Sequence, residues 1–247
     1  MLKHGRASAY TRFFDVDWDP PDTDLRDTVL VPILGTDLDA ALRAKEITVV
    51  ADTDPTEGAC VRYYDNTMPL SPESVAALRD ASGGIARGVA RLNADPVELR
   101  RVLDAQHYRL DHWETGDRRL NYRRFFDVKT LVGLRQEDAP TYEQSHALIL
   151  DLVKSEIVDG LRIDHIDGLR DPGAYLRRLR EDAPGAYVVV EKILEPGEEL
   201  RDEWPVEGTT GYDFLNLVGG LFVDPSGEKP LDTVYERITG KTAGLAA

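Results

Sequence analysis

Two carboxylates, each at the end of a short apolar run, are the residues of this chain best placed to do chemistry. The run Val158–His165 contains Asp164, and the run Tyr187–Glu191 ends on Glu191. One helix-sized segment separates them, so we expect a strand–helix–strand unit whose strands are parallel neighbours, about 4.8 Å apart. Carboxyl groups at matching strand ends would then be roughly 5 Å apart, as a retaining glycosidase requires of its nucleophile and its acid/base.

Arg162 is expected to keep Asp164 ionised. Residues two apart in a strand share a face, and a guanidinium beside a carboxylate favours the charged form that a nucleophile needs. Glu191 instead follows a valine run, and an apolar setting favours the protonated form that suits a general acid. A structural ion pair and a buried strand that reaches water would leave the same pattern, because perturbed carboxylates also occur in structural networks.

The composition describes a folded protein with an acidic surface. The chain has 247 residues, 42% of them hydrophobic, and a net charge of −15. This length suits one large domain or two smaller ones, and the charge argues against a nucleic-acid or anionic-membrane surface. Cys60 is the single cysteine, so no intrachain disulfide can form. With no membrane-length apolar run and no signal peptide, we expect a cytoplasmic protein without a membrane partner.

The first half of the chain predicts a small antiparallel sheet. Val29–Leu34 has the pattern of a short strand, which Pro32 restricts to a sheet edge. Residues 46–51 and 60–64 predict a pair of strands, with a turn-rich stretch, Asp52–Gly58, between them.

Residues 71–110 predict helices. Ser71 and Asp95 are each followed by a proline, which is the pattern of an N-cap with proline at the first helical position. Gly83 and Gly84 are expected to break the region between the two helices.

Aromatic and basic residues interleave between residues 113 and 137. Trp113, Tyr122 and Phe126 lie near Arg123 and Arg124 in the sequence. Such aromatics can stack on sugar rings while arginines bond to hydroxyl groups, so the candidate substrate contacts are Trp113, Tyr122, Arg123 and Phe126. Ordinary core residues with surface charges would give the same pattern.

From about residue 140 the pattern alternates between helix and strand. Thr141-x-x-Gln144 is the pattern of a capping box, and it opens a helix whose apolar stripe is Leu148, Ile149, Leu152, Val153 and Ile157. Asp171-Pro172 caps a second helix, which ends at Pro184-Gly185. A short helix at residues 198–204, a strand end or loop at 208–211 and a helix at 212–222 follow. This α/β rhythm is typical of a (β/α) barrel or a doubly wound sheet.

At these residues the chain resembles the α-amylase superfamily. Gly160–Asp164 is similar to the segment that carries the nucleophile at the end of barrel strand four, and Val189–Leu194 is similar to the strand-five segment that carries the acid/base. Within that superfamily the chain resembles the maltooligosyltrehalose synthase family over nearly its whole length. The matching stretches, in order, are residues 10–19, 121–128, 159–168 and 207–214.

The resemblance implies an α/β fold in two parts. Residues 139–247 would form a partial (β/α)8 TIM barrel, with about strands four to six and their helices. Residues 1–138 would be a mainly helical subdomain with a small antiparallel sheet, inserted between strands three and four. The strand-three segment and the third catalytic carboxylate of the superfamily do not occur in this sequence. We therefore expect an internal fragment that is inactive alone and whose partner is the remainder of the same enzyme.

The reaction that the resemblance implies is an intramolecular transglucosylation. It converts the reducing-end α-1,4 linkage of a maltooligosaccharide into an α,α-1,1 linkage, a step of trehalose biosynthesis. Asp164 would be the nucleophile, Glu191 the acid/base, and Arg162 would orient and ionise Asp164. His165 and Lys192 would lie beside the site and contact the substrate. No cofactor and no metal are implied.

Three other functions fit the same residues. An amylase-type α-glucan hydrolase would release free reducing glucose, and a non-catalytic glucan-binding fragment would bind sugar without turnover. A metal-dependent phosphoester hydrolase would use Asp164, His165, Asp167 and Asp171 as ligands. Neighbouring strand residues point to opposite faces, however, so Asp164 and His165 would not converge on one ion.

Overall fold

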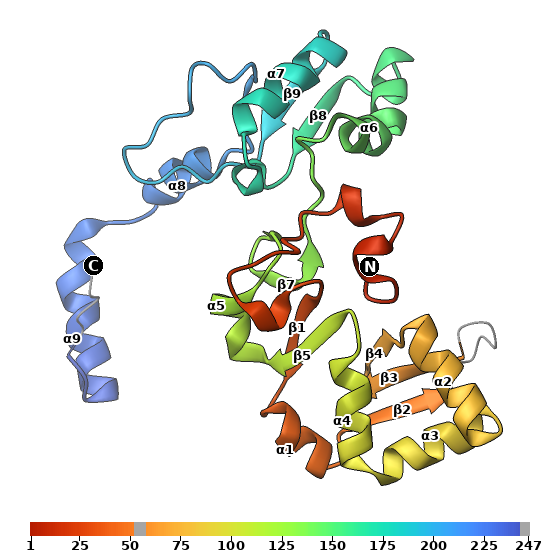
Figure 1. The fold of residues 1–247 in the computed structure, drawn as a ribbon. Helices are drawn as coiled ribbons and strands as arrows, with labels where there is room; N and C mark the ends of the chain where they lie inside the picture. Colours follow the sequence, from red (N-terminus) through yellow and green to blue (C-terminus); the bar gives the residue numbers. More distant parts are fainter. Residues whose placement is uncertain (52–57, 243–247) are drawn as a thin grey trace. The chain divides into compact units, whose positions relative to one another are not determined.

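The computed structural model describes residues 1–51 and 58–242, which fold as two compact units (Figure 1). The first unit is Met1–Ala147 and the second is Leu148–Ala247. The boundary lies inside a helix, α6 (Ala139–Lys154). Apart from Gly58, the turn expected between the two strands of the first half lies outside the described residues.

The first unit combines short strands with helices. Three strands predicted from the sequence, at residues 29–34, 46–51 and 60–64, are present to within a residue at each end. In chain order its elements are β1 (Val29–Leu34), α1 (Leu38–Arg43), β2 (Ile47–Ala51), β3 (Ala59–Tyr63), β4 (Asn66–Pro69), α2 (Pro72–Ser82), α3 (Ile85–Ala94), α4 (Pro96–Asp104), β5 (Tyr108–His112), α5 (Gly116–Arg119), β6 (Arg124–Phe125) and β7 (Val128–Val132).

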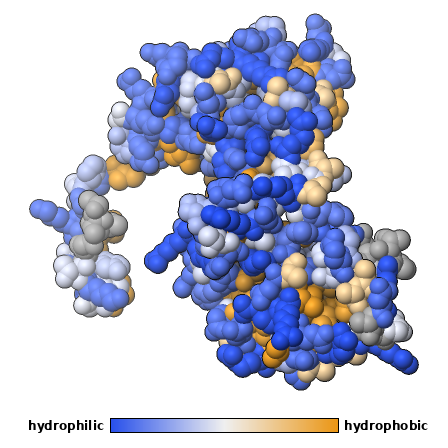
Figure 2. All heavy atoms as spheres, in the orientation of Figure 1, coloured by the Kyte–Doolittle hydropathy of each residue, from blue (hydrophilic) through white to orange (hydrophobic). Residues whose placement is uncertain are grey.

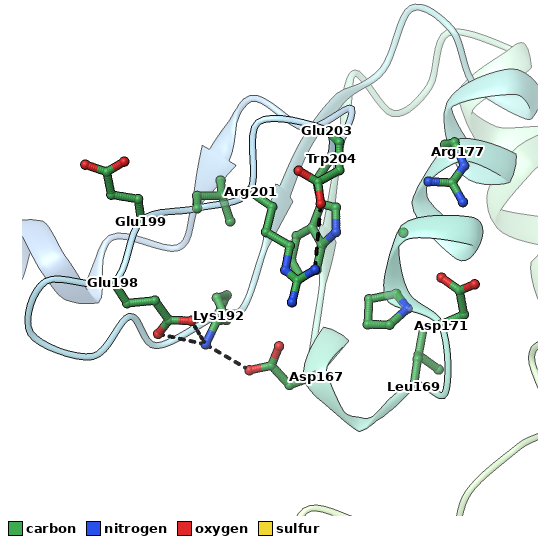
Figure 3. A pocket seen from close by; sticks show the side chains of 13 residues that line it. Asp167, Leu169, Asp171, Arg177, Lys192, Glu198, Glu199, Arg201, Glu203 and Trp204 are labelled. Carbon is green, nitrogen blue, oxygen red and sulfur yellow. Dashed lines mark hydrogen bonds and ion pairs between the residues drawn. The ribbon is translucent and has the colours of Figure 1, made fainter.

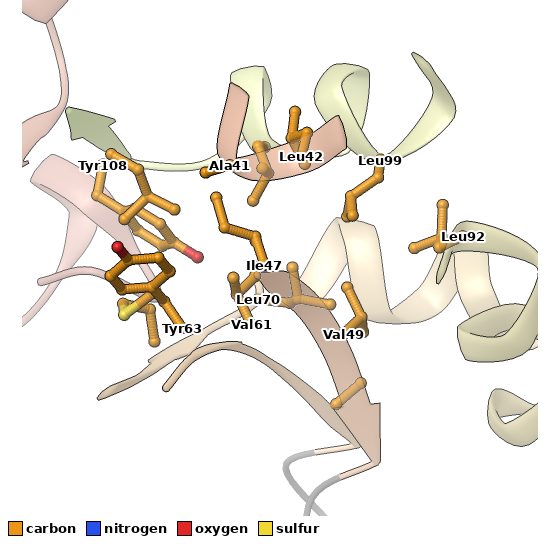
Figure 4. Packing of buried hydrophobic residues seen from close by; sticks show 14 of the residues in the cluster. Ala41, Leu42, Ile47, Val49, Val61, Tyr63, Leu70, Leu92, Leu99 and Tyr108 are labelled. Carbon is orange, nitrogen blue, oxygen red and sulfur yellow. The ribbon is translucent and has the colours of Figure 1, made fainter. Parts of the chain in front are cut away.

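The expected antiparallel sheet has three strands, in the order β2-β3-β4. Val49 on β2 and Met68 on β4 both pair with Val61 on β3, and all three side chains are buried. Alternate residues of a strand share a face, so this row forms one apolar side of the sheet. Helical residues such as Leu92 and Leu99 pack against that side (Figure 4). This core holds the first unit together independently of the second.

Asn93 on α3 covers part of the free edge of β2. Its side-chain amide accepts a hydrogen bond from the backbone N–H of Val49 and donates one to the Val49 carbonyl, each at 2.8 Å. Helix α3 is thereby fixed beside the sheet by a polar contact as well as by its apolar face.

The predicted helix caps of this region are confirmed. The Ser71 side chain accepts from the backbone N–H of Ser74 at the start of α2, and Asp95 does the same for Val97 and Glu98 at the start of α4. Gly83 ends α2 with a φ of 65°, a left-handed conformation that glycine adopts without strain.

The prediction of helix as far as residue 110 was wrong at its end. Helix α4 stops at Asp104, and Tyr108–His112 forms β5, which pairs in parallel with β1. Tyr108 and Leu110 alternate with polar residues and are buried, so tertiary pairing with Val29–Leu34 decides the conformation here. Pro32 lies in a sheet of only two strands, where both strands are edges.

The second unit is built on a parallel sheet of three strands in the order β10-β9-β8. Helix α7 connects β8 to β9, so the predicted strand–helix–strand unit with adjacent parallel strands is confirmed. The elements are β8 (Gly160–Ile163), α7 (Pro172–Asp182), β9 (Tyr187–Val190), β10 (Gly208–Thr209), α8 (Tyr212–Gly220) and α9 (Glu228–Thr239), after the second half of α6.

The core of this unit lies between α7 and the sheet. Leu176 and Leu179 on α7 are each 1% exposed, and Val188 and Val190 on β9 are equally buried. As the sequence predicted, Asp171 caps α7 by accepting from the backbone N–H of Ala174 at 2.9 Å. This packing holds the C-terminal ends of β8 and β9 side by side.

Two details of the second-half prediction were wrong. Helix α6 begins at Ala139 and Thr141 lies inside it, because the Asp138 carboxylate accepts from both the backbone N–H and the hydroxyl of Thr141. Residues 198–204, all of which the structure describes, run as turns and irregular chain instead of a helix. The Glu198 carboxylate bonds back to the backbone N–H of Glu195, which favours a local turn.

Helices α8 and α9 leave much apolar surface uncovered. On α8, Phe214 and Leu217 are 67% and 73% exposed, and on α9 Leu231 is 70% exposed. The link between the two helices, which holds Phe222, is visible as an apolar patch in Figure 2. Monomeric proteins rarely expose contiguous apolar surface on this scale.

Candidate active site

Asp164 and Glu191 follow the C-terminal ends of neighbouring parallel strands. Ile163, the last residue of β8, pairs with Val190, the last residue of β9. The backbone N–H of Glu191 also donates to the Ile163 carbonyl at 2.7 Å. The two carboxylate residues therefore occupy equivalent places at one end of the sheet, which is where parallel α/β proteins usually carry their chemistry.

The side chain of Arg162 lies beside Asp164, as the sequence predicted. Its Nη1 atom is 2.7 Å from Oδ1 of Asp164, and the two side chains are 53% and 43% exposed. An adjacent guanidinium stabilises the ionised carboxylate. The Asp164 carboxylate is therefore paired with a cation and open to solvent.

Glu191 has a different environment. It is 7% exposed and directly follows the fully buried Val190. Its Oε2 atom accepts a hydrogen bond from the backbone N–H of His165 at 2.9 Å. One carboxylate of the pair is thus open and paired with a cation, and the other is enclosed and bonded to the main chain. This is the asymmetry that separates a nucleophile from an acid/base.

Lys192 is held in a network that the sequence did not reveal. Its ammonium lies 3.2 Å from Oδ2 of Asp167 and 2.9 Å from Oε1 of Glu198, and the side chain is 16% exposed (Figure 3). The Glu198 carboxylate, with Asp167, raises the pKa of Lys192. In turn, the backbone N–H of Glu195 and the ammonium of Lys192 lower the pKa of Glu198. The network fixes the chain just after Glu191.

Two pockets adjoin these residues. Lys192, Asp167 and Glu198 line one of them, together with Arg177 and Trp204 (Figure 3). Arg162 lines the other, with Thr210, Tyr212 and Phe214. The second pocket was missed in the sequence, because no residue spacing shows that the start of α8 lies beside β8.

The four aromatic and basic candidates between residues 113 and 126 lie in the first unit. Trp113 is 51% exposed, with the Lys129 ammonium 5.4 Å from its ring centre, and Phe126 is 43% exposed. Tyr122 is half-buried against Val16, and burial raises its pKa to about 12.

Arg123 differs from these aromatic candidates in being fully engaged with acidic residues. Its guanidinium lies 3.0 Å from Asp15 and 3.1 Å from Glu137. Trp113 and Phe126 are therefore partly exposed to solvent, whereas Tyr122 and Arg123 have substantial structural contacts.

Neither a cluster of metal-ligating side chains nor a membrane-spanning helix is found among the described residues. Within residues 1–51 and 58–242, no three His, Cys, Asp or Glu side chains gather as ligands for a metal ion. None of the helices in that part of the chain is both long enough and apolar enough to cross a membrane.

The curated proteins with similar sequences include maltooligosyl trehalose synthases. A putative maltooligosyl trehalose synthase of Mycobacterium tuberculosis is 41% identical over 238 residues, which are 96% of this chain and 26% of that protein. No protein-family model matches the chain.

Solved structures give the same result. The maltooligosyltrehalose synthase of Arthrobacter ramosus matches with a TM-score of 0.73 and 36% identity, over 99% of this chain and 28% of that one. A hypothetical maltooligosyl trehalose synthase of Sulfolobus tokodaii matches with a TM-score of 0.66 and 34% identity, over 96% of this chain and 27% of that one. By sequence and by structure, the chain is similar to one segment of maltooligosyltrehalose synthases, and it spans about a quarter of the length of these relatives.

Proposed function

We propose that this chain carries the nucleophile and the acid/base of a maltooligosyltrehalose-forming transglucosylase. The observation that supports this most directly is the asymmetry between the two carboxylates at adjacent strand ends. Asp164 is open and paired with Arg162, whereas Glu191 is buried and bonded to the main chain. The family of the relatives supports the substrate class, a maltooligosaccharide.

The proposed reaction has two displacements at one anomeric carbon. In the first, an Asp164 oxygen bonds to that carbon, the reducing-end α-1,4 C–O bond breaks, and Glu191 gives its proton to the departing oxygen. The released glucose stays in the site. In the second displacement its anomeric hydroxyl attacks the covalent glucosyl ester, Glu191 takes the hydroxyl proton, and Asp164 leaves as a carboxylate. The product contains an α,α-1,1 linkage, and the enzyme returns to its starting state.

The finer fold assignment belongs to the same proposal. We assign β8, β9 and β10 to strands four, five and six of a (β/α)8 barrel, residues 139–247 to the partial barrel, and residues 1–138 to an inserted subdomain. Three parallel strands that are neighbours in chain order support this assignment, since barrels add strands in sequence order.

We further propose that activity requires segments beyond these 247 residues. The exposed apolar residues of α8 and α9 support this, as does the length of the relatives, of which the chain covers 26–28%. The partner of the chain is then the remainder of the same enzyme, and the isolated chain should not turn over maltopentaose. Clear formation of non-reducing product by the purified chain alone would contradict this point.

The experiment is a chimaera. Residues 1–247 replace the matching region of the Mycobacterium tuberculosis relative, and the product formed from maltopentaose is analysed for non-reducing trehalose ends. Asp164→Asn should remove nearly all turnover, because no glycosyl-enzyme can form, while substrate binding persists. Asp151→Asn, on the exposed face of α6, is the matched control. An Asp164→Asn chimaera that keeps a tenth of the parent rate would exclude Asp164 as the nucleophile.

The same assay separates the alternatives. Free reducing glucose as the main product would identify an amylase-type hydrolase. Maltopentaose binding without any product, in a chimaera whose parent relative is active, would identify a non-catalytic glucan-binding segment.

A further inference from the structure

The turn that follows Asp164 has an unusual main-chain conformation. His165 has φ 52° and ψ 48°, the left-handed region, which costs a non-glycine residue about 1 kcal/mol or more. The turn continues through a short 3-10 segment, Ile166–Gly168, in which the His165 carbonyl accepts from the Gly168 N–H at 3.0 Å. Ile166 is fully buried, which anchors the turn in the core of the second unit.

This conformation directs the N–H of His165 toward Glu191. The amide nitrogen lies 2.9 Å from Oε2 of the carboxylate. The other oxygen, Oε1, has no hydrogen-bond partner among the residues that the structure describes. The strained residue thus bonds to one defined oxygen of the proposed acid/base and leaves the other free.

We propose that the His165 main chain is a positioning element that determines which oxygen of Glu191 carries the catalytic proton. The inference rests on the proposed role of Glu191 as the acid/base. It assigns the transferred proton to Oε1, because Oε2 is occupied by the His165 N–H. Asp164 and the N–H donor are consecutive residues, so one turn sets both the nucleophile and the orientation of the acid/base.

The hydrogen bond from the His165 N–H to Oε2 is compatible with both protonation states of Glu191. In the acid form Oε1 carries the proton and Oε2 is the carbonyl oxygen, which still accepts from the N–H. In the base form Oε2 is a carboxylate oxygen and accepts more strongly. The proton passes between Oε1 and the sugar oxygen in either direction while the side chain stays in place, so no reorganisation is needed between the two displacements.

Gly168 leaves room for the ring of His165 beside this turn. A Cβ atom at Gly168 would lie 2.3 Å from Cδ2 and 2.5 Å from Nε2 of the His165 ring. Any side chain at this position therefore requires the imidazole to move, and the proposal predicts that the backbone N–H of His165 moves with it. Gly185 provides a matched control, since a Cβ atom there meets no heavy atom within 4 Å.

The test uses the ¹⁵N-labelled 247-residue chain and follows the amide signal of residue 165 by NMR during an acid titration. In the parent chain this signal should move as Glu191 takes up its proton. The movement should disappear in Glu191→Gln and in Gly168→Ala, and it should persist in Gly185→Ala. The proposal is overturned if the residue 165 amide signal still moves with pH in Glu191→Gln, or if it moves in Gly168→Ala as it does in the parent chain.

A double variant makes the test specific to the ring contact. Glycine adopts the left-handed conformation freely and has no ring, so His165→Gly should keep the titrating amide and should tolerate Gly168→Ala. The double variant should regain the signal that Gly168→Ala loses. If Gly168→Ala does not fold, recovery of a folded double variant with the signal supports the proposal. A double variant that stays unfolded, or folds without the signal, contradicts it.

A kinetic measurement on the chimaera links the contact to the reaction. Gly168→Ala should lower kcat about 100-fold with little change in KM, as expected for misplacement of a catalytic group. In His165→Gly/Gly168→Ala much of the loss in kcat should be recovered, with a higher KM because the ring of His165 is itself a candidate substrate contact. An unchanged kcat in Gly168→Ala overturns the positioning role while the proposed function stands. Full activity of the Asp164→Asn chimaera would contradict the proposed function, whereas the amide titration would still report the contact between His165 and Glu191.

Discussion

Arg162 and Asp164 lie two residues apart at the end of β8, with Nη1 of the arginine 2.7 Å from Oδ1 of the aspartate. Both side chains are about half exposed, so solvent screening makes the pair a weak source of stability. Under the proposed function its importance is chemical, because the pair holds the Asp164 carboxylate at a place that a substrate can reach.

Removal of this guanidinium should slow the reaction more than it weakens the fold. In the chimaera, Arg162→Met should lower kcat about 10–100-fold, because an oriented charge partner of the nucleophile is lost, while the urea midpoint of the 247-residue chain changes little. Arg237→Met, on the exposed part of α9, is the control. A parent-like kcat in Arg162→Met would show that the ion pair has no catalytic role.

The distance between the two carboxyl groups is a separate prediction. A retaining mechanism requires about 5–5.5 Å between them, whereas an inverting one requires roughly 6.5–9.5 Å. We expect the shorter class, within an ångström or two, in a crystal structure of the assembled enzyme. A separation above roughly 10 Å between Asp164 and Glu191 would exclude the proposed roles of both residues.

Glu207 should make the stability of the second unit depend on pH. Its carboxylate accepts from the backbone N–H of Val188 and is paired with Arg180, and these contacts, the first above all, lower its pKa. A lowered pKa means that the contribution is complete above the ordinary glutamate value of about 4.3 and is lost as the pH falls further.

Glu207→Gln should therefore unfold at lower urea concentration than the parent at pH 7, and the gap should close below about pH 4. Glu181→Gln, an exposed residue of α7, should match the parent throughout. A gap for Glu207→Gln that stays constant from pH 7 to pH 3 would show that ionisation of Glu207 is not its source.

Burial predicts which leucines stabilise the second unit. Leu176 on α7 is 1% exposed, so Leu176→Ala should cost about 2–5 kcal/mol in the free energy of unfolding. Leu231 on α9 is 70% exposed, and the same change there should cost about 0.5 kcal/mol or less. Urea titration of the 247-residue chain measures both, and equal costs would mean that α9 is packed in solution.

The exposed aromatic rings of the first unit give a binding prediction. If Trp113 and Phe126 stack on glucose units, their replacement by alanine should weaken maltoheptaose binding by the chimaera about tenfold each, a loss of about 1.4 kcal/mol. Tyr64→Ala removes an even more exposed ring outside this region and should have no effect. Parent-like calorimetric affinity in both variants would exclude these two residues as substrate contacts.

Sequence patterns predicted the structure correctly where the interacting residues lie close together in the sequence. Asp95 and Asp171 cap the helices that they precede, because a side chain at the N-cap position can reach a backbone N–H two or three residues further on. The ion pair of Arg162 with Asp164 was equally predictable from strand alternation.

The remainder depends on partners far away in the sequence. The N-cap of α6 is Asp138 rather than Thr141, and two competing local caps cannot be ranked from residue types alone. The pairing of β5 with β1, and the Lys192–Glu198 ion pair, join residues whose proximity only the fold creates. The left-handed turn at His165 has no sequence signal except Gly168, whose purpose is clear only once the ring is placed.

Asn93 occupies the place that a further strand would take beside Val49. Its amide meets both the N–H and the carbonyl of that residue, on the strand that forms the free side of the β2-β3-β4 sheet. A sheet edge whose backbone groups are already satisfied is a poor template for another polypeptide. The Asn93 side chain thus blocks strand pairing at Val49, the middle residue of β2, and so interrupts this edge as a template for aggregation.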